Sequence, residues 1–115
     1  VGKVLPELVG KLDGYAMRVP TPNVSVVDFK FLTTRATTAD EINAAIRKAA
    51  NGPLRGILGY TEWKNVSCDF NHDMRSGIVD ASQTRASGQL VKVLVWFDNE
   101  WAYANRMLDI AQRWT

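Results

Sequence analysis

The sequence has few of the residues that disulfide bonds and metal sites require. Its 115 residues include one cysteine, Cys68, and one histidine, His72. A single cysteine excludes an internal disulfide bond and a cysteine-based metal framework. His72 has no second histidine or cysteine at ligand spacing. We therefore expect no metal site in this chain.

Long apolar segments and clusters of one charge are also missing. The longest apolar run, residues 93–97, is far shorter than the roughly 20 residues that cross a bilayer. Charged residues at positions 3, 7 and 11 are unlike a secretory leader. Basic residues are scattered, and the net charge is only +2. We expect a cytoplasmic protein that binds neither membranes nor nucleic acid.

Cysteine and histidine often act in catalysis, but the neighbours of Cys68 and His72 do not favour a catalytic role. Cys68 lies between Ser67 and Asp69, and an adjacent carboxylate does not favour the reactive thiolate. We interpret Cys68 as structural. His72 lies in a polar loop before Asp73, where it is either a general base oriented by that carboxylate or a solvated loop residue. The second interpretation is favoured, since no nucleophile stands beside it.

The composition is that of a globular unit, with 46% hydrophobic and 23% charged residues. Apolar patterning predicts strands at residues 15–19, 24–33, 56–62, 76–81 and 90–97. The capping-box spacing of Thr38 and Glu41 predicts a helix that ends at Asn51-Gly52-Pro53. Asp98 is suited to cap a last helix to about residue 113. This order predicts an α+β domain with a mostly antiparallel sheet.

Two polar residues are candidates for ligand binding. Arg18 precedes a rigid Pro-Thr-Pro turn, which suits bidentate capture of a phosphate or carboxylate. A surface salt bridge explains Arg18 equally well. Asn99 lies at a strand-to-helix junction among aromatic residues, and its amide offers both a donor and an acceptor. No glycine-rich phosphate loop occurs, so the chain cannot hold a dinucleotide by the usual mechanism alone.

Four segments of the chain, taken together and in order, resemble the glyceraldehyde-3-phosphate dehydrogenases. They are VGKVLPEL at 1–8, RVPTPNVSVVD at 18–28, GILGYTE at 56–62 and WFDNEW at 96–101. The resemblance implies that the chain is one partial domain, residues 1–115, from the C-terminal part of the catalytic domain. It further implies a mostly antiparallel mixed sheet with helices on one face.

The resemblance also implies roles for three residues. Arg18 matches the family arginine that contacts the substrate phosphate, and Asn99 matches the asparagine that holds the nicotinamide carboxamide of NAD. Tyr103 matches a tyrosine close to the nicotinamide. Neither Cys68 nor His72 matches the family's catalytic cysteine and histidine, and no Rossmann domain is present. We therefore expect no catalytic residue in this chain, no bound NAD and no activity by itself.

Two alternatives remain open. Segments at 69–73, 78–80, 83–85 and 104–109 also look like erythrose-4-phosphate dehydrogenase, a close relative acting on another sugar phosphate. The other alternative is a stand-alone, non-catalytic module that serves dimerisation or binding. The resemblance implies a homo-oligomer, with the last helix, whose apolar side includes Trp101 and Leu108, docked on or exchanged with a neighbour.

Overall fold

The computed structural model describes residues 1–114. The chain forms a four-stranded mixed sheet with two α-helices and two 3-10 turns, an α+β fold as expected. The elements in chain order are η1 (Pro6–Leu8), β1 (Ser25–Leu32), α1 (Ala39–Asn51), β2 (Leu58–Thr61), η2 (Ser67–Phe70), β3 (Gly77–Ser87), β4 (Leu90–Phe97) and α2 (Asn99–Arg113).

The strands lie in the order β1-β4-β3-β2, with β4 and β3 at the centre. β1 and β3 both run antiparallel to β4, whereas β2 runs parallel to β3. The pairing of β3 with β4 shifts register between Asp80 and Arg85, where β3 bulges. This arrangement confirms the mostly antiparallel mixed sheet.

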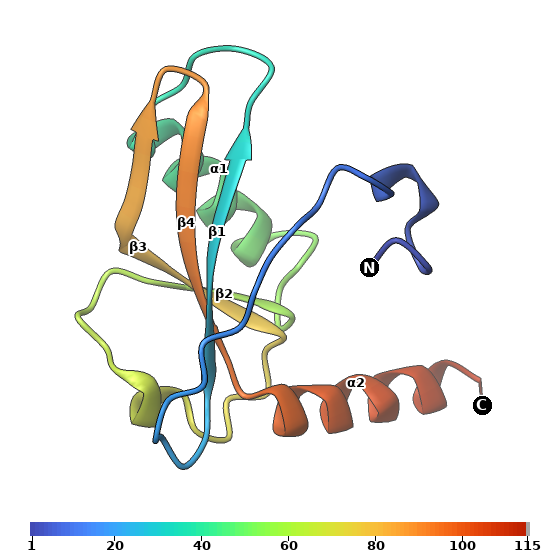
Figure 1. The fold of residues 1–115 in the computed structure, drawn as a ribbon. Helices are drawn as coiled ribbons and strands as arrows, with labels where there is room; N and C mark the ends of the chain where they lie inside the picture. The colour runs from blue at the N-terminus through green and yellow to red at the C-terminus, as the bar shows by residue number, and fades with distance from the viewer. Residues whose placement is uncertain (115) are drawn as a thin grey trace.

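The first helix, α1, covers one face of the sheet, against β3 and β2 (Figure 1). Its start is fixed by the predicted capping box, in which the Thr38 side chain accepts from the Glu41 N–H and the Glu41 carboxylate accepts from the Thr38 N–H. A hydrogen bond from Arg35, supported by Thr37 and the Thr38 backbone, lowers the pKa of Glu41 to about 2. The carboxylate therefore stays ionised in its capping role at neutral pH.

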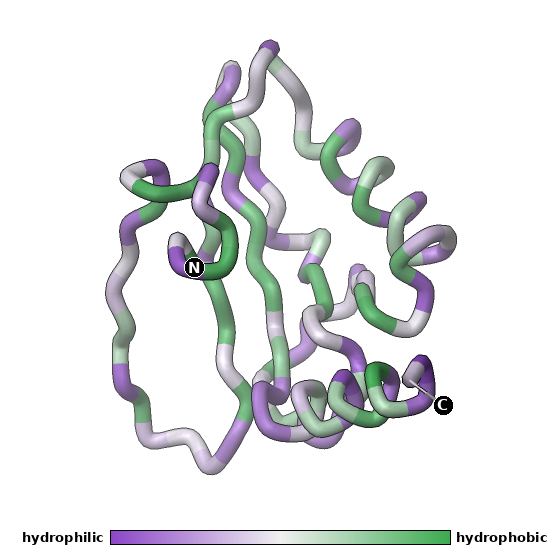
Figure 2. Tube along the Cα trace, turned by 90° about the vertical axis from the view of Figure 1, so that its right-hand side faces the viewer, coloured by the Kyte–Doolittle hydropathy of each residue, from purple (hydrophilic) through white to green (hydrophobic). Residues whose placement is uncertain are grey.

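One predicted strand is wrong. Residues 15–19 are extended, but among residues 1–114 no strand pairs with them. Tyr15 and Met17 are exposed to solvent, and Pro20 and Pro22, which follow the segment, have no backbone N–H to donate. Figure 2 shows this N-terminal segment arching away on the side of the sheet opposite α1. Alternating apolar residues do not form a strand without a neighbour to accept the backbone hydrogen bonds.

A compact core lies on the sheet face opposite α1. It consists of Val24, Phe70 and Ile78, with Trp96 packed against them. The rings of Phe70 and Trp96 stack with their centroids 5.5 Å apart. Residues from three distant segments therefore meet here, and the turn η2 covers one end of the sheet.

The second helix, α2, projects from the end of β4 (Figure 1). Of its residues only Ala102 is buried, whereas Trp101, Leu108 and Ile110 are 44–63% exposed. The apolar side that the sequence predicted for this helix is therefore open to solvent in the single chain.

Candidate functional site

Asp98 is the centre of the junction between β4 and α2. Its side chain is fully buried. One carboxylate oxygen accepts from the Trp101 N–H at 3.0 Å and so caps α2. The other accepts from the Asn23 side-chain amide and from the His72 N–H, each at 2.9 Å. Asp98 thus connects the start of α2 with two segments that are far away in sequence.

These hydrogen bonds keep Asp98 ionised. Burial by itself raises the pKa of Asp98, because it disfavours the charged form. Donation from the backbone N–H groups of His72 and Trp101, with the amide of Asn23, outweighs that effect and brings the pKa below its ordinary value. Asp98 is therefore a fixed negative charge that acts as a structural acceptor at neutral pH.

The segment of residues 18–24, which contains Arg18, is held in place at its C-terminal end. The Asn23 amide donates both to Asp98 and to the Asn71 side chain, at 2.9 and 2.7 Å. The next residue, Val24, is buried and has φ of 70°, a conformation that a β-branched residue adopts only when its surroundings impose it. Packing of Val24 and the bonds of Asn23 together fix where this segment enters β1.

The three residues assigned by resemblance lie on the surface. Asn99 is the first residue of α2, and Tyr103 follows one turn later on the same face. Tyr103 is 68% exposed, and Arg18 and Asn99 are also exposed. Within residues 1–114, none of the three side chains donates or accepts a hydrogen bond or forms an ion pair. The polar groups of all three are therefore available to a ligand.

The structure also places His72 and Cys68. The ring of His72 stacks on Trp101 with centroids 4.4 Å apart, while the Asp73 carboxylate is bonded to the Arg75 guanidinium. Asp73 therefore does not orient His72, which rules out that general-base arrangement. Cys68 is exposed within η2. Among the described residues, no group of three or more potential metal ligands comes together.

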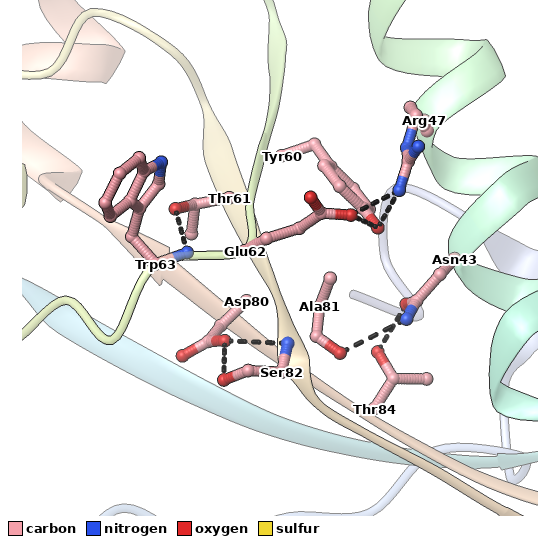
Figure 3. A network of polar contacts seen from close by, with 10 residues as sticks. All are labelled: Asn43, Arg47, Tyr60, Thr61, Glu62, Trp63, Asp80, Ala81, Ser82 and Thr84. Carbon is pink, nitrogen blue, oxygen red and sulfur yellow. Dashed lines mark hydrogen bonds and ion pairs between the residues drawn. The ribbon is translucent and has the colours of Figure 1, made fainter.

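A polar network that the sequence did not reveal joins α1 to β2 and β3 (Figure 3). Asn43 donates to the Ala81 carbonyl at 3.2 Å and accepts from the Thr84 hydroxyl at 2.7 Å. On the same side, Arg47 lies over the Tyr60 ring and pairs with Glu62. The helical spacing of Asn43 and Arg47 was visible in the sequence, but their partners depend on strand order.

We expect Asn43→Leu to lower the free energy of unfolding by about 1–3 kcal/mol, because it leaves the buried Thr84 hydroxyl without a partner. Urea-induced unfolding followed by circular dichroism measures the effect. Lys48→Leu, on an exposed side of the same helix, is the matched control and should change stability little. Equal stability of the two variants would show that the network does not hold α1.

The same side of the molecule has a shallow hollow of about 440 Å³, lined by residues of α1 and β2 that include Lys48, Asn51 and Tyr60. Of its two cations, Arg47 and Lys48, the first is already paired with Glu62. The hollow does not include Arg18 or Asn99. The hollow is therefore distinct from the residues expected to bind substrate and cofactor.

The family model described as glyceraldehyde 3-phosphate dehydrogenase, C-terminal domain, matches residues 1–99. The chain belongs to this family. The match includes Arg18 and Asn99 and ends where α2 begins.

Glyceraldehyde-3-phosphate dehydrogenases from several bacteria are similar to almost the whole chain. The protein from Cereibacter sphaeroides is 57% identical over 112 residues, which are 96% of this chain and 34% of that protein. The one from Xanthobacter flavus is 58% identical over 112 residues, 96% of this chain and 33% of its own length. The chain spans about a third of the length of the curated relatives that it matches. The similarity also extends into α2, where Tyr103 lies.

Within residues 1–114, no helix is both long enough and apolar enough to span a membrane.

Proposed function

We propose that this chain supplies substrate-phosphate and nicotinamide contacts to an NAD-dependent phosphorylating glyceraldehyde-3-phosphate dehydrogenase of glycolysis and gluconeogenesis. The observation that supports this most is the identity of more than half of the aligned residues to proteins of that name, over 96% of the chain. In this proposal residues 1–115 form one partial domain, the C-terminal part of the catalytic domain.

In this proposal Arg18 binds the phosphate of the substrate. Its guanidinium is exposed and has no carboxylate partner within residues 1–114. An unpaired guanidinium can donate two parallel hydrogen bonds to a phosphate group. Because Asn23 ties the segment to Asp98, Arg18 projects from a backbone that is anchored near the start of α2.

Asn99 and Tyr103 face the cofactor in this proposal. The Asn99 amide is exposed at the first position of α2, where it can donate to and accept from the nicotinamide carboxamide. The exposed ring of Tyr103 lies one turn further along the same face and can line the pocket. NAD, when bound, would supply the hydride acceptor, and these residues would only orient it.

We further propose that the 115-residue chain is inactive by itself and binds no NAD alone. Cys68 and His72 are its only cysteine and histidine, and neither matches the family's nucleophile and base. Without a nucleophile no covalent intermediate forms with the aldehyde. Erythrose 4-phosphate as substrate and a stand-alone, non-catalytic module remain the alternatives.

The proposal is tested with a chimera in which these 115 residues replace the matching third of the Cereibacter sphaeroides enzyme. NADH formation from glyceraldehyde 3-phosphate and inorganic phosphate is followed, with erythrose 4-phosphate as the competing substrate. We expect an active chimera that prefers glyceraldehyde 3-phosphate, and no NADH from the 115-residue chain alone. A folded but inactive chimera would favour the non-catalytic module.

In the active chimera, Arg18→Ala is expected to raise the KM for glyceraldehyde 3-phosphate by roughly 10-fold to 100-fold. The reason is the loss of a charge-assisted hydrogen bond of about 1.5–3 kcal/mol. Arg55→Ala removes another exposed guanidinium and should leave KM unchanged. If Arg18→Ala also left KM unchanged, Arg18 would not bind the phosphate.

We also propose a cytoplasmic homo-oligomer. The exposed apolar residues of α2, including Leu108 and Ile110, support a contact with a neighbouring subunit, because such side chains are more stable when covered. A strictly monomeric chain at micromolar concentration would contradict this proposal.

A further inference from the structure

A short loop, residues 71–76 between η2 and β3, contacts the start of α2 at two points through one residue. The ring of His72 stacks on the ring of Trp101, with the centroids 4.4 Å apart. The backbone N–H of His72 donates to the Asp98 carboxylate, which caps the helix, at 2.9 Å. His72 therefore supports the first turn of α2 both through its backbone and through its ring.

The backbone conformation of His72 is what allows this double contact. Its φ is 62°, in the left-handed region that few residues other than glycine adopt, although histidine is found there more often than most. The N–H thus reaches the buried carboxylate of Asp98, while the ring lies against Trp101 with 24° between the ring planes. Such a conformation persists only where the surroundings hold it. The loop is therefore a fixed support for α2.

Contacts with this loop hold α2 against rotation about its axis. Each helical residue turns about 100°, so Trp101 lies about 100° to one side of the buried Ala102. Arg106, whose Nη1 donates to the Ser76 hydroxyl at 3.1 Å, lies about 40° to the other side. The same loop thus contacts the helix on both sides of its buried residue, and the stack of Trp101 on His72 is the contact nearer to the start of the helix.

The rotation of α2 decides where Asn99 faces. Asn99 is the first residue of the helix, and Trp101 follows about 200° around the axis. A rotation that moved Trp101 off His72 would carry the Asn99 amide through the same angle. A carboxamide is recognised by a donor and an acceptor in fixed positions, and a misplacement of about 1 Å can cost about 100-fold in rate. The orientation of Asn99 therefore depends on the support under Trp101.

We propose that His72 is a positioning residue for the cofactor: its ring, stacked on Trp101, holds the first turn of α2 so that Asn99 faces the nicotinamide. This inference rests on the proposed function, in which Asn99 binds the nicotinamide carboxamide. The role needs no proton transfer by His72, in keeping with the Asp73 carboxylate being bonded to Arg75.

The same loop reaches the Arg18 segment through a different residue. The Asn71 side chain accepts from the Asn23 amide at 2.7 Å, and Asn23 also donates to Asp98. Neither bond uses the ring of His72. Loss of that ring should therefore weaken the cofactor contact and leave the phosphate contact at Arg18 as it is.

The test removes each ring of the stack in turn. His72→Asn introduces a residue type that also accepts a positive φ and keeps the N–H that donates to Asp98, but it leaves Trp101 without a stacking partner. Trp101→Leu removes the other ring from an exposed position on α2, whereas Trp101→Phe keeps an aromatic ring there. Met74→Ala, in the same loop and 57% exposed, is the matched control.

The variants are compared in the chimera with the Cereibacter sphaeroides enzyme. Isothermal titration calorimetry gives the Kd of NAD without turnover, steady-state rates give the KM of glyceraldehyde 3-phosphate, and circular dichroism checks folding. We expect His72→Asn and Trp101→Leu each to raise the Kd of NAD about threefold to tenfold, with the KM of the aldehyde unchanged. Trp101→Phe and Met74→Ala should leave both values near those of the unsubstituted chimera.

The double variant shows whether His72 acts through Trp101. If it does, the chimera with both His72→Asn and Trp101→Leu should bind NAD about as well as either single variant, because residues that act through one contact are not additive. Additive effects on the Kd of NAD would overturn the inference, and so would an equal rise in the KM of the aldehyde. If His72→Asn does not fold, His72→Gly takes its place with the same expectation, since glycine adopts a positive φ without strain.

Asn99→Ala separates failure of this inference from failure of the proposed function. If Asn99→Ala weakened NAD binding and His72→Asn did not, His72 would not position Asn99, and the proposed cofactor contact would stand. If Asn99→Ala left the Kd of NAD unchanged, the proposed contact would fail and the inference with it.

Discussion

Asp98→Ala is expected to lower the free energy of unfolding by about 3–5 kcal/mol. The substitution removes the cap of α2, which contributes roughly 0.5–2 kcal/mol. It also leaves the His72 N–H without its acceptor and leaves the Asn23 amide with Asn71 as its remaining acceptor. An unpaired donor in a buried setting costs about 1–3 kcal/mol. Guanidinium unfolding monitored by tryptophan fluorescence gives the difference.

The pH dependence of this variant provides an independent check. The folded pKa of Asp98 lies below its ordinary value of 3.8. Its ionised form therefore stabilises the fold fully above that pH, and the contribution is lost as the pH falls through the lower, folded pKa. The deficit of Asp98→Ala should accordingly be largest near neutral pH and should shrink under acid.

Asp13→Ala serves as the matched control, because Asp13 is exposed and bonds only to the next residue. It should change stability by less than about 0.5 kcal/mol. If Asp98→Ala behaved like Asp13→Ala, Asp98 would not be the connection between the Arg18 segment and α2.

Ile78→Ala is expected to lower the free energy of unfolding by about 2–5 kcal/mol. Ile78 is 1% exposed and lies in the core with Val24 and Phe70. It is opposite Trp96 on one side and opposite Gly59 on the other. A Cβ on Gly59 would come within 2.8 Å of the Ile78 side chain, so the strands meet tightly here. The cavity left by truncation cannot close without moving β3 against both neighbours.

Urea unfolding measures this effect, with Ile110→Ala on α2 as the matched control. Ile110 is 50% exposed, and the same truncation there should cost well under half as much, because little buried volume is lost. A small effect of Ile78→Ala would mean that the face of the sheet opposite α1 is loosely packed and that Val24 is not held by this core.

The sequence predicted both helix starts correctly because their signals are local. Thr38 and Glu41 lie within one helical turn, and Asp98 immediately precedes α2, so the capping bonds need no distant residue. The limits of the last strand, β4, were also predicted correctly. A run of apolar residues that ends at the helix-capping Asp98 has few alternative secondary structures. β3 extends beyond its predicted end at residue 81, because the polar residues after the bulge pair again with β4.

The strand predicted at residues 15–19 failed for a non-local reason. Its alternating pattern is compatible with a strand, but backbone pairing requires a neighbouring strand that no pattern in the segment itself can supply. The same limitation applied to Asn43. Its place on a polar face of α1 was visible, whereas its bonds to Ala81 and Thr84 exist only because α1 packs across β3.

The sequence alone determined the family, the α+β class, the helix caps and the exclusion of a cysteine-based metal site or an internal disulfide, because these follow from residue identity and short-range spacing. Arg18, Asn99 and Tyr103 as ligand contacts remain predictions from resemblance. Only the tertiary structure decided that Asp98 is buried between Asn23, His72 and α2, and that Asn43 of α1 bonds to Ala81 and Thr84 of β3. Both depend on contacts between residues far apart in the chain, which form only when packing fixes the order of the strands.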